Sequence, residues 1–324
     1  MAAPTPITDR IRAKLLEDTA AYVRNVAPPS SATMREEPIL PLVGPQTRPN
    51  GQVYQPRLLE NLEDLAVLRS ARDRGEHTLL TGQPGTGKTA MAEAAFVAFA
   101  RPGAHTGMET IVGSADTTDA DFVGTFVQDP YTGHFTWIDG PLIRSMRHGI
   151  PLLVDEIALI PPTVLSVLYP LMDGRRVLHV TSNPHLPPIE AAEGWAVIGA
   201  CNPHVPGADL SEALASRFTH HIEVPTDWDL AADLGVPEPF ITAALNLETR
   251  TRAPEVTYDG WIPQLRDGLA FATNATAFGL SYALAAFLRR CPAEDREEMR
   301  EALSKVYSGY MPQPLALGSR SRGV

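Results

Sequence analysis

The chain has 324 residues, enough for one αβ domain with a smaller appendage. Its formal charge of −11 argues against a protein whose main work is to coat nucleic acid or an anionic membrane. Its two cysteines, Cys201 and Cys291, lie far apart without metal-ligand spacing, so neither a zinc site nor a disulfide framework is supported and a reducing cytoplasm is expected.

The N-terminal segment predicts an amphipathic helix. Apolar residues recur at helical spacing from Ile7 to Val26, with Arg and Lys between them. A proline-rich stretch follows, so residues 1–50 are expected to form a helix and a linker arm. The helix docks either on a partner or on its own core, and the sequence leaves both open. Charges throughout the first residues argue against a signal peptide, and no apolar run reaches the length of a membrane span.

Residues 51–225 alternate between short apolar runs and helical patterns, which is typical of a parallel sheet covered by helices. The expected strands lie in HTLLTG, ETIVGS, IPLLVDEI, AVIGACNP and HHIEVP. Residues 226–308 carry only helical patterns, in PFITAALNLETR, ATAFGLSYALAAFLRR and PAEDREEMREALSKVYSG. The prediction is therefore an α/β core followed by a small all-helical domain, with residues 309–324 as a flexible tail.

The stretch TGQPGTGKT, residues 81–89, lies between the first expected strand and a helix. It matches the phosphate-binding pattern GxxxxGK[ST] in its confirming context. Backbone N–H groups of such a loop surround phosphate oxygens, Lys88 reaches the terminal phosphates, and the Thr89 hydroxyl ligates Mg²⁺. The predicted nucleotide-binding residues are Gly82, Gln83, Pro84, Gly85, Thr86, Gly87, Lys88, Thr89 and Ala90.

A second motif, PLLVDE at residues 151–156, is a buried strand that ends in two acids. In P-loop enzymes an aspartate at this place holds Mg²⁺, and a glutamate beside it can polarise the water that attacks the γ-phosphate. Asp155 is therefore predicted to bind the metal and Glu156 to act as the general base. The pair indicates hydrolysis in addition to binding.

The order GQPGTGKT, LLVDEI, VIGACNP and LSEALASRF resembles that of the AAA+ ATPases. The segments between these motifs are similar to the dynein-related branch that contains the MoxR and CbbQ/NorQ proteins. In that branch an acidic turn precedes a glycine, here Asp119, Asp121 and Gly124, and a hairpin is inserted ahead of a Gly-Pro-Leu step at residues 140–142. The resemblance covers residues 54–224 and implies a P-loop AAA+ αβα sandwich with a helical lid.

The resemblance also implies two catalytic residues beyond Glu156. Asn202 matches the sensor-1 position, where an amide holds the attacking water or a phosphate oxygen; the alternative is an asparagine that only caps its strand before Pro203. Arg217 matches the arginine finger, which reaches the nucleotide of the neighbouring subunit. The alternative for Arg217 is a solvated surface arginine.

Other positions remain open. The slot for the sensor-2 arginine of the lid holds Ala277, Phe278 or Gly279, so that residue is left unassigned. Tyr54 packs either on adenine or in the core. Four arginines, at positions 144, 147, 175 and 176, face either a neighbouring subunit, the pore or solvent.

The function implied by the resemblance is ATP hydrolysis with Mg²⁺ by a homo-oligomeric ring, usually a hexamer, that remodels a client protein. Relatives typically act with a partner that carries a von Willebrand factor A domain. The alternative is a nucleic-acid motor or loader, which the acidic balance disfavours. A small-molecule kinase or a GTPase is disfavoured because no guanine-recognition motif of the NKxD type follows the core.

Overall fold

The computed structural model describes residues 40–102, 106–202, 210–252 and 260–318. The predicted N-terminal helix lies outside these residues, so it stays a prediction.

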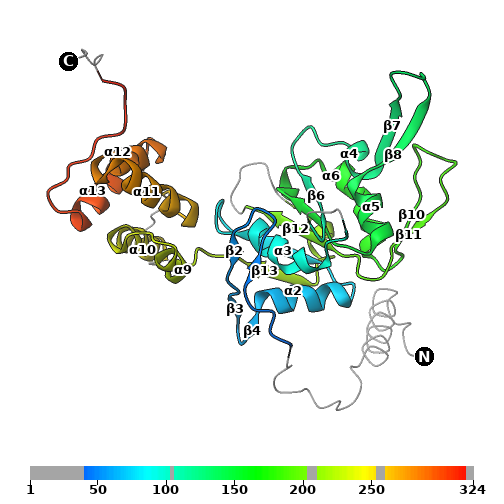
Figure 1. Ribbon diagram of the computed structural model, residues 1–324, viewed down its shortest axis with the longest axis horizontal. Helices are drawn as coiled ribbons and strands as arrows, with labels where there is room; N and C mark the ends of the chain where they lie inside the picture. The colour runs from blue at the N-terminus through cyan, green and yellow to red at the C-terminus, as the bar shows by residue number, and fades with distance from the viewer. Residues whose placement is uncertain (1–39, 103–105, 203–209, 253–259, 319–324) are drawn as a thin grey trace, which may run out of the picture. The chain divides into compact units, whose positions relative to one another are not determined.

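A five-stranded parallel sheet forms the centre of the core (Figure 1). Its strands are β5 (Thr78–Thr81), β6 (Glu109–Val112), β9 (Leu152–Asp155), β12 (Val197–Cys201) and β13 (His220–Glu223), in the order β13-β5-β12-β9-β6. Each strand lies in one of the five predicted apolar runs. The predicted α/β fold is therefore confirmed.

Both faces of the sheet are buried, which explains why its strands are continuous apolar runs. Because successive strand residues point to opposite faces, Leu79 and Leu152 belong to one hydrophobic core while Leu80 and Leu153 belong to another. These side chains are at most 5% exposed. Each such burial contributes roughly 1.5–3 kcal/mol to the free energy of unfolding.

Helices cover the two faces as separate layers. On the face of Leu80 lie α2 (Asp64–Asp73) and α3 (Lys88–Phe96), and α3 continues into the 3₁₀ helix η1 (Val97–Phe99). The other face carries α4 (Asp119–Val123), α5 (Pro141–His148), η2 (Ile157–Leu159), α6 (Pro162–Leu165), η3 (Ser166–Leu168), α7 (Tyr169–Met172) and α8 (Glu212–Ala215). The result is the predicted αβα sandwich.

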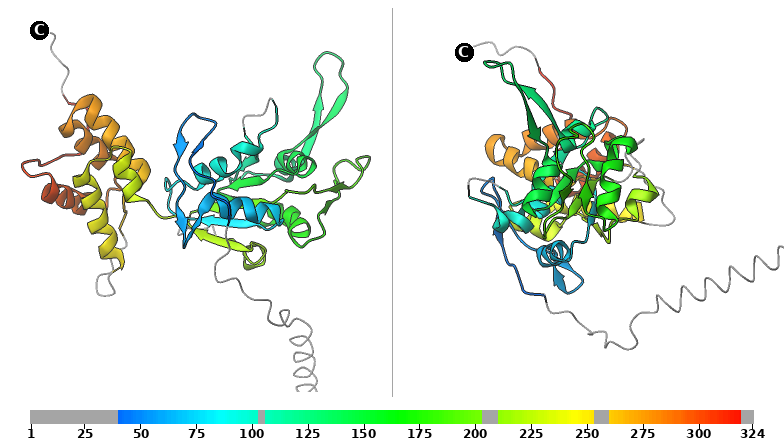
Figure 2. Two further views of the ribbon diagram at one scale, coloured as in Figure 1. Left: turned by 60° about the horizontal axis from the view of Figure 1, so that its bottom comes forward. Right: turned by 90° about the vertical axis from the view of Figure 1, so that its right-hand side faces the viewer.

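Two hairpins interrupt the layer that contains α5. The first pairs β7 (Gly124–Gln128) with β8 (Phe135–Asp139) and projects away from the sheet in every view (Figures 1 and 2). Gly124 begins it with φ of 120°, and a Cβ there would lie 2.2 Å from the carbonyl oxygen of Ile138. The second pairs β10 (Val177–Leu178) with β11 (Ile189–Glu190) ahead of β12. The first hairpin occurs where the resemblance implied one, ahead of the Gly-Pro-Leu step.

The C-terminal part is helical. It consists of α9 (Trp228–Asp233), α10 (Glu238–Arg252), α11 (Leu265–Phe278), α12 (Leu280–Arg290) and α13 (Arg296–Val306). These helices have their own hydrophobic core, in which Phe240, Phe271 and Phe287 pack ring against ring. The run ATAFGLSYALAAFLRR is not one helix, because Gly279 separates α11 from α12 with φ of 85°.

The segment before α2 is more structured than a linker arm. It contains two small antiparallel pairs, β1 (Gln46–Thr47) with β2 (Val53–Tyr54) and β3 (Leu58–Leu59) with β4 (Leu62–Glu63). Arg48 forms an ion pair of 2.6 Å with Glu93 of α3. The described part of the expected arm therefore packs on the core.

Residues 309–318, part of the expected tail, have no regular element. Within them Pro312 is buried, and the Leu315 N–H donates to the Ala285 carbonyl at 2.9 Å. This stretch lies against α12.

Candidate nucleotide site

The register of the sheet brings three predicted motifs to one edge. Strand β12 pairs with both β5 and β9, with Cys201 opposite Thr81 and Gly199 opposite Val154. The P-loop follows β5, the acidic pair ends β9, and Asn202 follows β12. Since the carboxyl ends of parallel strands meet at one edge, segments more than 100 residues apart become neighbours.

The P-loop backbone has positive φ angles that favour glycine, as Gly82 and Gly87 illustrate. Gly82 has φ of 157°, and a Cβ there would lie 2.4 Å from the carbonyl oxygen of Val224. Gly87 has φ of 100° and is the N-cap of α3. Between them the buried Thr86 hydroxyl donates to the Gln83 carbonyl at 3.1 Å and fixes the loop internally.

Lys88 is buried at 7% exposure, and its ammonium group has three protein acceptors. It donates to the carbonyl oxygens of Gly82 at 2.7 Å and Gln83 at 3.1 Å, and to Oδ1 of Asn202 at 2.7 Å. An ammonium has three N–H donors, so all three are used. Burial lowers the pKa of Lys88, and the negative charges of Glu156 and Asp155 oppose that shift.

Asn202 joins Lys88 to Glu156. Its Nδ2 donates to both carboxylate oxygens of Glu156, at 2.8 and 2.9 Å, while its Oδ1 accepts from Lys88. The opposite amide orientation would set an NH₂ group against an ammonium, so the charges on either side determine this one. Glu156 itself has a left-handed φ of 52°, which is uncommon for a residue with a side chain.

Thr89 and Asp155 provide oxygen ligands of the kind that Mg²⁺ binds. The Thr89 hydroxyl donates to Oδ2 of Asp155 at 2.8 Å. Mg²⁺ is usually bound by one or two protein oxygens together with phosphates and water, so this pair fits the ion. In the described ranges, no three His, Cys, Asp or Glu side chains converge into a metal site of their own.

These groups share one pocket of about 450 Å³. Its walls include Pro84, Gly85, Gly87, Lys88, Thr89, Ala90, Asp155, Glu156 and Asn202. Gly82, Gln83 and Thr86 do not line it; they shape the loop and hold Lys88. The structure thus brings Lys88, Thr89, Asp155, Glu156 and Asn202 to one pocket.

Arg217 is the exception, since it does not line this pocket. Its guanidinium pairs with Asp173, with Nε 2.7 Å from Oδ1, and lies over the ring of Tyr169 at 4.6 Å. Within the chain, Arg217 therefore belongs to a separate cluster.

Comparison with known proteins agrees with this geometry. The model of the AAA domain, dynein-related subfamily, matches residues 77–218, which run from the start of β5 past Arg217. Protein NorQ of Paracoccus denitrificans is 32% identical over 158 residues, which cover 49% of this chain and 55% of NorQ. Residues 77–218 are an AAA+ domain of the dynein-related, MoxR/NorQ type.

Other relatives match the same part of the chain. The uncharacterized protein YojN of Bacillus subtilis is 33% identical over 170 residues, covering 50% of this chain and 53% of YojN. Midasin of Giardia intestinalis is 29% identical over 189 residues, covering 48% of this chain and 4% of midasin. The chain spans about half the length of NorQ and YojN.

Two elements of the pocket were not predicted. Arg266, at the start of α11, lines it, and a Cβ on Gly85 would lie 2.8 Å from the Cβ of Arg266. The sensor-2 slot considered at residues 277–279 lies at the other end of α11, roughly 18 Å further along the helix. The β1–β2 hairpin contributes Arg48, Asn50 and Gln52.

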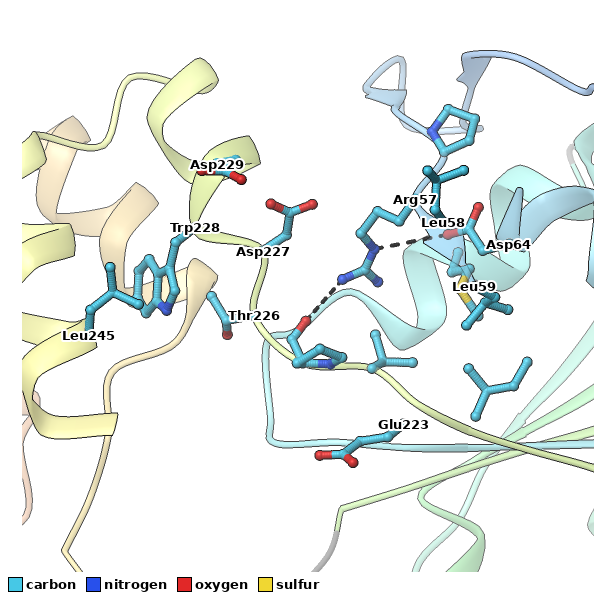
Figure 3. Close-up of a pocket in the computed structure, with 15 residues that line it drawn as sticks. Arg57, Leu58, Leu59, Asp64, Glu223, Thr226, Asp227, Trp228, Asp229 and Leu245 are labelled. Carbon is cyan, nitrogen blue, oxygen red and sulfur yellow. Dashed lines mark hydrogen bonds and ion pairs between the residues drawn. The ribbon is translucent and has the colours of Figure 1, made fainter. Parts of the chain in front are cut away.

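A second pocket, of about 660 Å³, lies near the ends of β3 and β13, and Trp228 of α9 and Leu245 of α10 also line it (Figure 3). Arg57 crosses it, donating to the Pro225 carbonyl at 2.9 Å with its Nε 3.9 Å from Asp64. Its apolar walls include Leu59, Met91 and Trp228. Residue 54 does not line it, because Tyr54 is buried and its hydroxyl donates to Asp64 at 2.5 Å. Tyr54 is a core residue.

The sequence did not decide what the arginines at positions 144, 147, 175 and 176 face. Three of these four bind their own chain closely. Arg144 pairs with Glu109 at 2.7 Å, Arg147 pairs with Asp139 at 3.0 Å, and Arg176 donates to the Ala192 carbonyl at 3.0 Å. Arg175 is the most exposed, at 71%, and its nearest carboxylate is Asp173 at 3.5 Å.

Across the residues that the structure describes, no helix has both the length and the apolar composition of a membrane span.

Proposed function

We propose that the chain is a Mg²⁺-dependent ATPase that works as a homo-oligomeric, hexameric ring and remodels a client protein. The observation that carries the proposal is the connection of Lys88, Asn202 and Glu156 by hydrogen bonds at the edge where three strands end. One amide thereby links the residue suited to bind phosphate with the residue suited to activate water.

Binding begins at Lys88. A terminal phosphate of ATP needs an N–H from Lys88, so at least one of its bonds to Gly82, Gln83 or Asn202 is exchanged. The P-loop N–H groups and the N-terminal end of α3 supply the remaining donors. Thr89 and Asp155 would hold Mg²⁺, which neutralises phosphate charge when bound.

Hydrolysis rests on Glu156. In the proposed role its carboxylate accepts a proton from the water that attacks the γ-phosphate, and Asn202 orients that carboxylate. When Lys88 turns toward phosphate, Oδ1 of Asn202 becomes available to the water. The nucleotide base would occupy the pocket of Figure 3, whose apolar walls lie beside α3 through Met91.

The remaining catalytic group would come from a neighbour. Arg217 does not line the pocket of its own chain, and an arginine that stabilises the charge of phosphoryl transfer is worth about 10³–10⁵ in kcat. In this proposal Arg217 reaches the nucleotide of the adjacent subunit, so assembly completes each active site.

Client contact is assigned to the β7–β8 hairpin. Its apolar side chains are exposed: Phe126, Val127, Tyr131, Phe135 and Ile138 range from 45% to 96%. The hairpin projects from the sheet (Figure 2). Exposed aromatic and aliphatic groups on such an element favour contact with a polypeptide. A partner with a von Willebrand factor A domain is proposed from the resemblance to the MoxR/NorQ branch. The net charge of −11 disfavours nucleic acid as the client.

The test compares Glu156→Gln with Lys88→Ala. Glu156→Gln should keep the affinity for ATP within a few-fold and lower kcat by about 10²–10⁴, because only the base is lost. Lys88→Ala should weaken ATP binding itself. A matched control is Glu60→Gln, which changes an exposed glutamate that also has φ of 52°. Wild-type turnover in Glu156→Gln would refute the proposed chemistry.

A further inference from the structure

The Arg217 guanidinium is held on three sides by its own chain. Its Nε donates to Oδ1 of Asp173 at 2.7 Å, and its Nη2 donates to Oδ2 at 3.1 Å. Its Nη1 donates to the carbonyl oxygen of Ala213, one turn earlier. The side chain is 24% exposed, so it is fixed in place without being sealed from solvent.

Tyr169 supports the flat face of this guanidinium. Its ring centroid lies 4.6 Å from the Arg217 Cζ, a favourable stacking geometry for an arginine. The tyrosine hydroxyl in turn lies 3.1 Å from Oγ of Ser211, whose side chain caps α8 by accepting from the Leu214 N–H. The ring is thereby tied to the helix that precedes Arg217.

Arg217 has N–H donors beyond those used within its own chain, and these can bind an anion. A guanidinium has five N–H donors, and three of them are used by Asp173 and Ala213. The two that remain are on Nη1 and Nη2, one on each. Two donors on neighbouring nitrogens match two oxygens of a phosphate group.

The single carboxylate of Asp173 does not neutralise the two arginines beside it, Arg175 and Arg217. Asp173 also lies 3.5 Å from Arg175, so one negative charge faces two positive ones. The hydrogen bonds from Arg217, together with the charges of both arginines, hold the pKa of Asp173 below its usual value, which keeps it ionised at neutral pH.

We propose that Asp173 and Tyr169 are positioning residues that fix Arg217 with its two remaining N–H groups directed toward the phosphate of a nucleotide held by the neighbouring subunit. This inference rests on the proposed role of Arg217 in trans. A long arginine side chain loses rotamer freedom when it binds phosphate, and a clamp within its own chain removes that cost before assembly. Neither Asp173 nor Tyr169 touches the nucleotide.

The main test is Asp173→Asn, which keeps the size of the side chain and sets an amide NH₂ against Nη2 of Arg217. We expect kcat to fall about 10- to 100-fold, since a small misplacement of a catalytic group has effects of that size. The KM for ATP should stay within twofold of the wild-type value. The sedimentation of the assembly should be unchanged. Arg175→Gln is the matched control, because it removes the other partner of the same carboxylate and should leave kcat within twofold.

Two further variants separate positioning from general structural support. Asp173→Glu keeps the charge and should restore part of the turnover. Tyr169→Phe keeps the ring under Arg217 and should lower kcat less than Tyr169→Leu.

Mixed assemblies provide the decisive readout. Asp173→Asn subunits should recover hydrolysis when mixed with Glu156→Gln subunits, which supply a correctly held Arg217, and should not recover with Arg217→Ala subunits. If Arg217→Ala lowers kcat but Asp173→Asn has wild-type or higher turnover, the positioning role is overturned and the proposed ATPase stands. If Arg217→Ala itself has wild-type turnover, the role of Arg217 in trans and this inference both fail, whereas Glu156→Gln still tests hydrolysis separately.

Discussion

Asn202 donates to both carboxylate oxygens of Glu156 while it accepts from Lys88, so a single amide joins the ammonium of Lys88 to the carboxylate of Glu156. Both halves of the amide are used, and the side chain is 9% exposed. Such an arrangement lets the position of Lys88 affect the orientation of Glu156.

The first prediction concerns this amide. Asn202→Ala should lower kcat about 10- to 100-fold, because Glu156 loses both of its hydrogen bonds and its orientation. Asn202→Asp should be more damaging, since it sets a second carboxylate against Glu156. Steady-state hydrolysis together with ATP binding checks both variants. Equal and near wild-type kcat in the two would show that the amide only caps its strand.

The second prediction concerns acid stability and His77, which is 5% exposed. Its Nδ1 accepts the Val197 N–H at 3.0 Å, and burial, with the charge of Arg176, lowers its pKa to about 4. An unfolded histidine has a pKa near 6.5, so between about pH 6.5 and 4 the unfolded chain binds a proton that the folded chain does not. The free energy of unfolding should therefore fall as the pH is lowered through this window, by at most about 3 kcal/mol.

His77→Asn isolates that contribution. The asparagine Oδ1 can accept the same N–H but does not titrate, so urea unfolding should depend less on pH between 6.5 and 4 in the variant. His134→Asn, in the exposed loop of the β7–β8 hairpin, is the control. An unchanged pH dependence in His77→Asn would contradict the assignment.

The third prediction tests the hairpin. Tyr131 is 96% exposed at the turn between β7 and β8. In a Glu156→Gln background with ATP, Tyr131→Ala should reduce the amount of client retained by the assembly and leave ATP binding unchanged. Phe278→Ala, which removes an aromatic side chain 64% exposed on α11, is the matched control. Equal client retention in the two variants would remove the hairpin from the proposed mechanism.

Much of the site was predictable because its motifs end strands of one parallel sheet. The P-loop before Lys88 follows β5, and Asp155 ends β9 with Glu156 directly after it. The register of the sheet brings those strand ends together. The pairing of Arg217 with Asp173 joins residues 44 positions apart in a layer of short helices, where no periodicity marks a contact.

The break between α11 and α12, the pocket residue Arg266 and the β1–β2 hairpin were not predicted from the sequence. The sequence pattern around ATAFGLSYALAAFLRR continues across Gly279, so one helix was expected where two exist. Arg266, at the start of α11, lies outside that run, and no motif marked it as a pocket residue. The β1–β2 hairpin was missed for a similar reason, since its strands are two residues long in a segment rich in proline and glycine.

In the proposed ring, each active site takes its general base from one subunit and its arginine from the next. The most direct measurement is ATP hydrolysis by mixtures of Glu156→Gln and Arg217→Ala subunits at equal total concentration, with co-assembly verified by differential tags. Each variant alone should be nearly inactive, and the mixture should regain hydrolysis at interfaces that pair the intact Glu156 of one subunit with the intact Arg217 of its neighbour. Mixed assemblies that form but hydrolyse no more ATP than either variant alone would contradict the account.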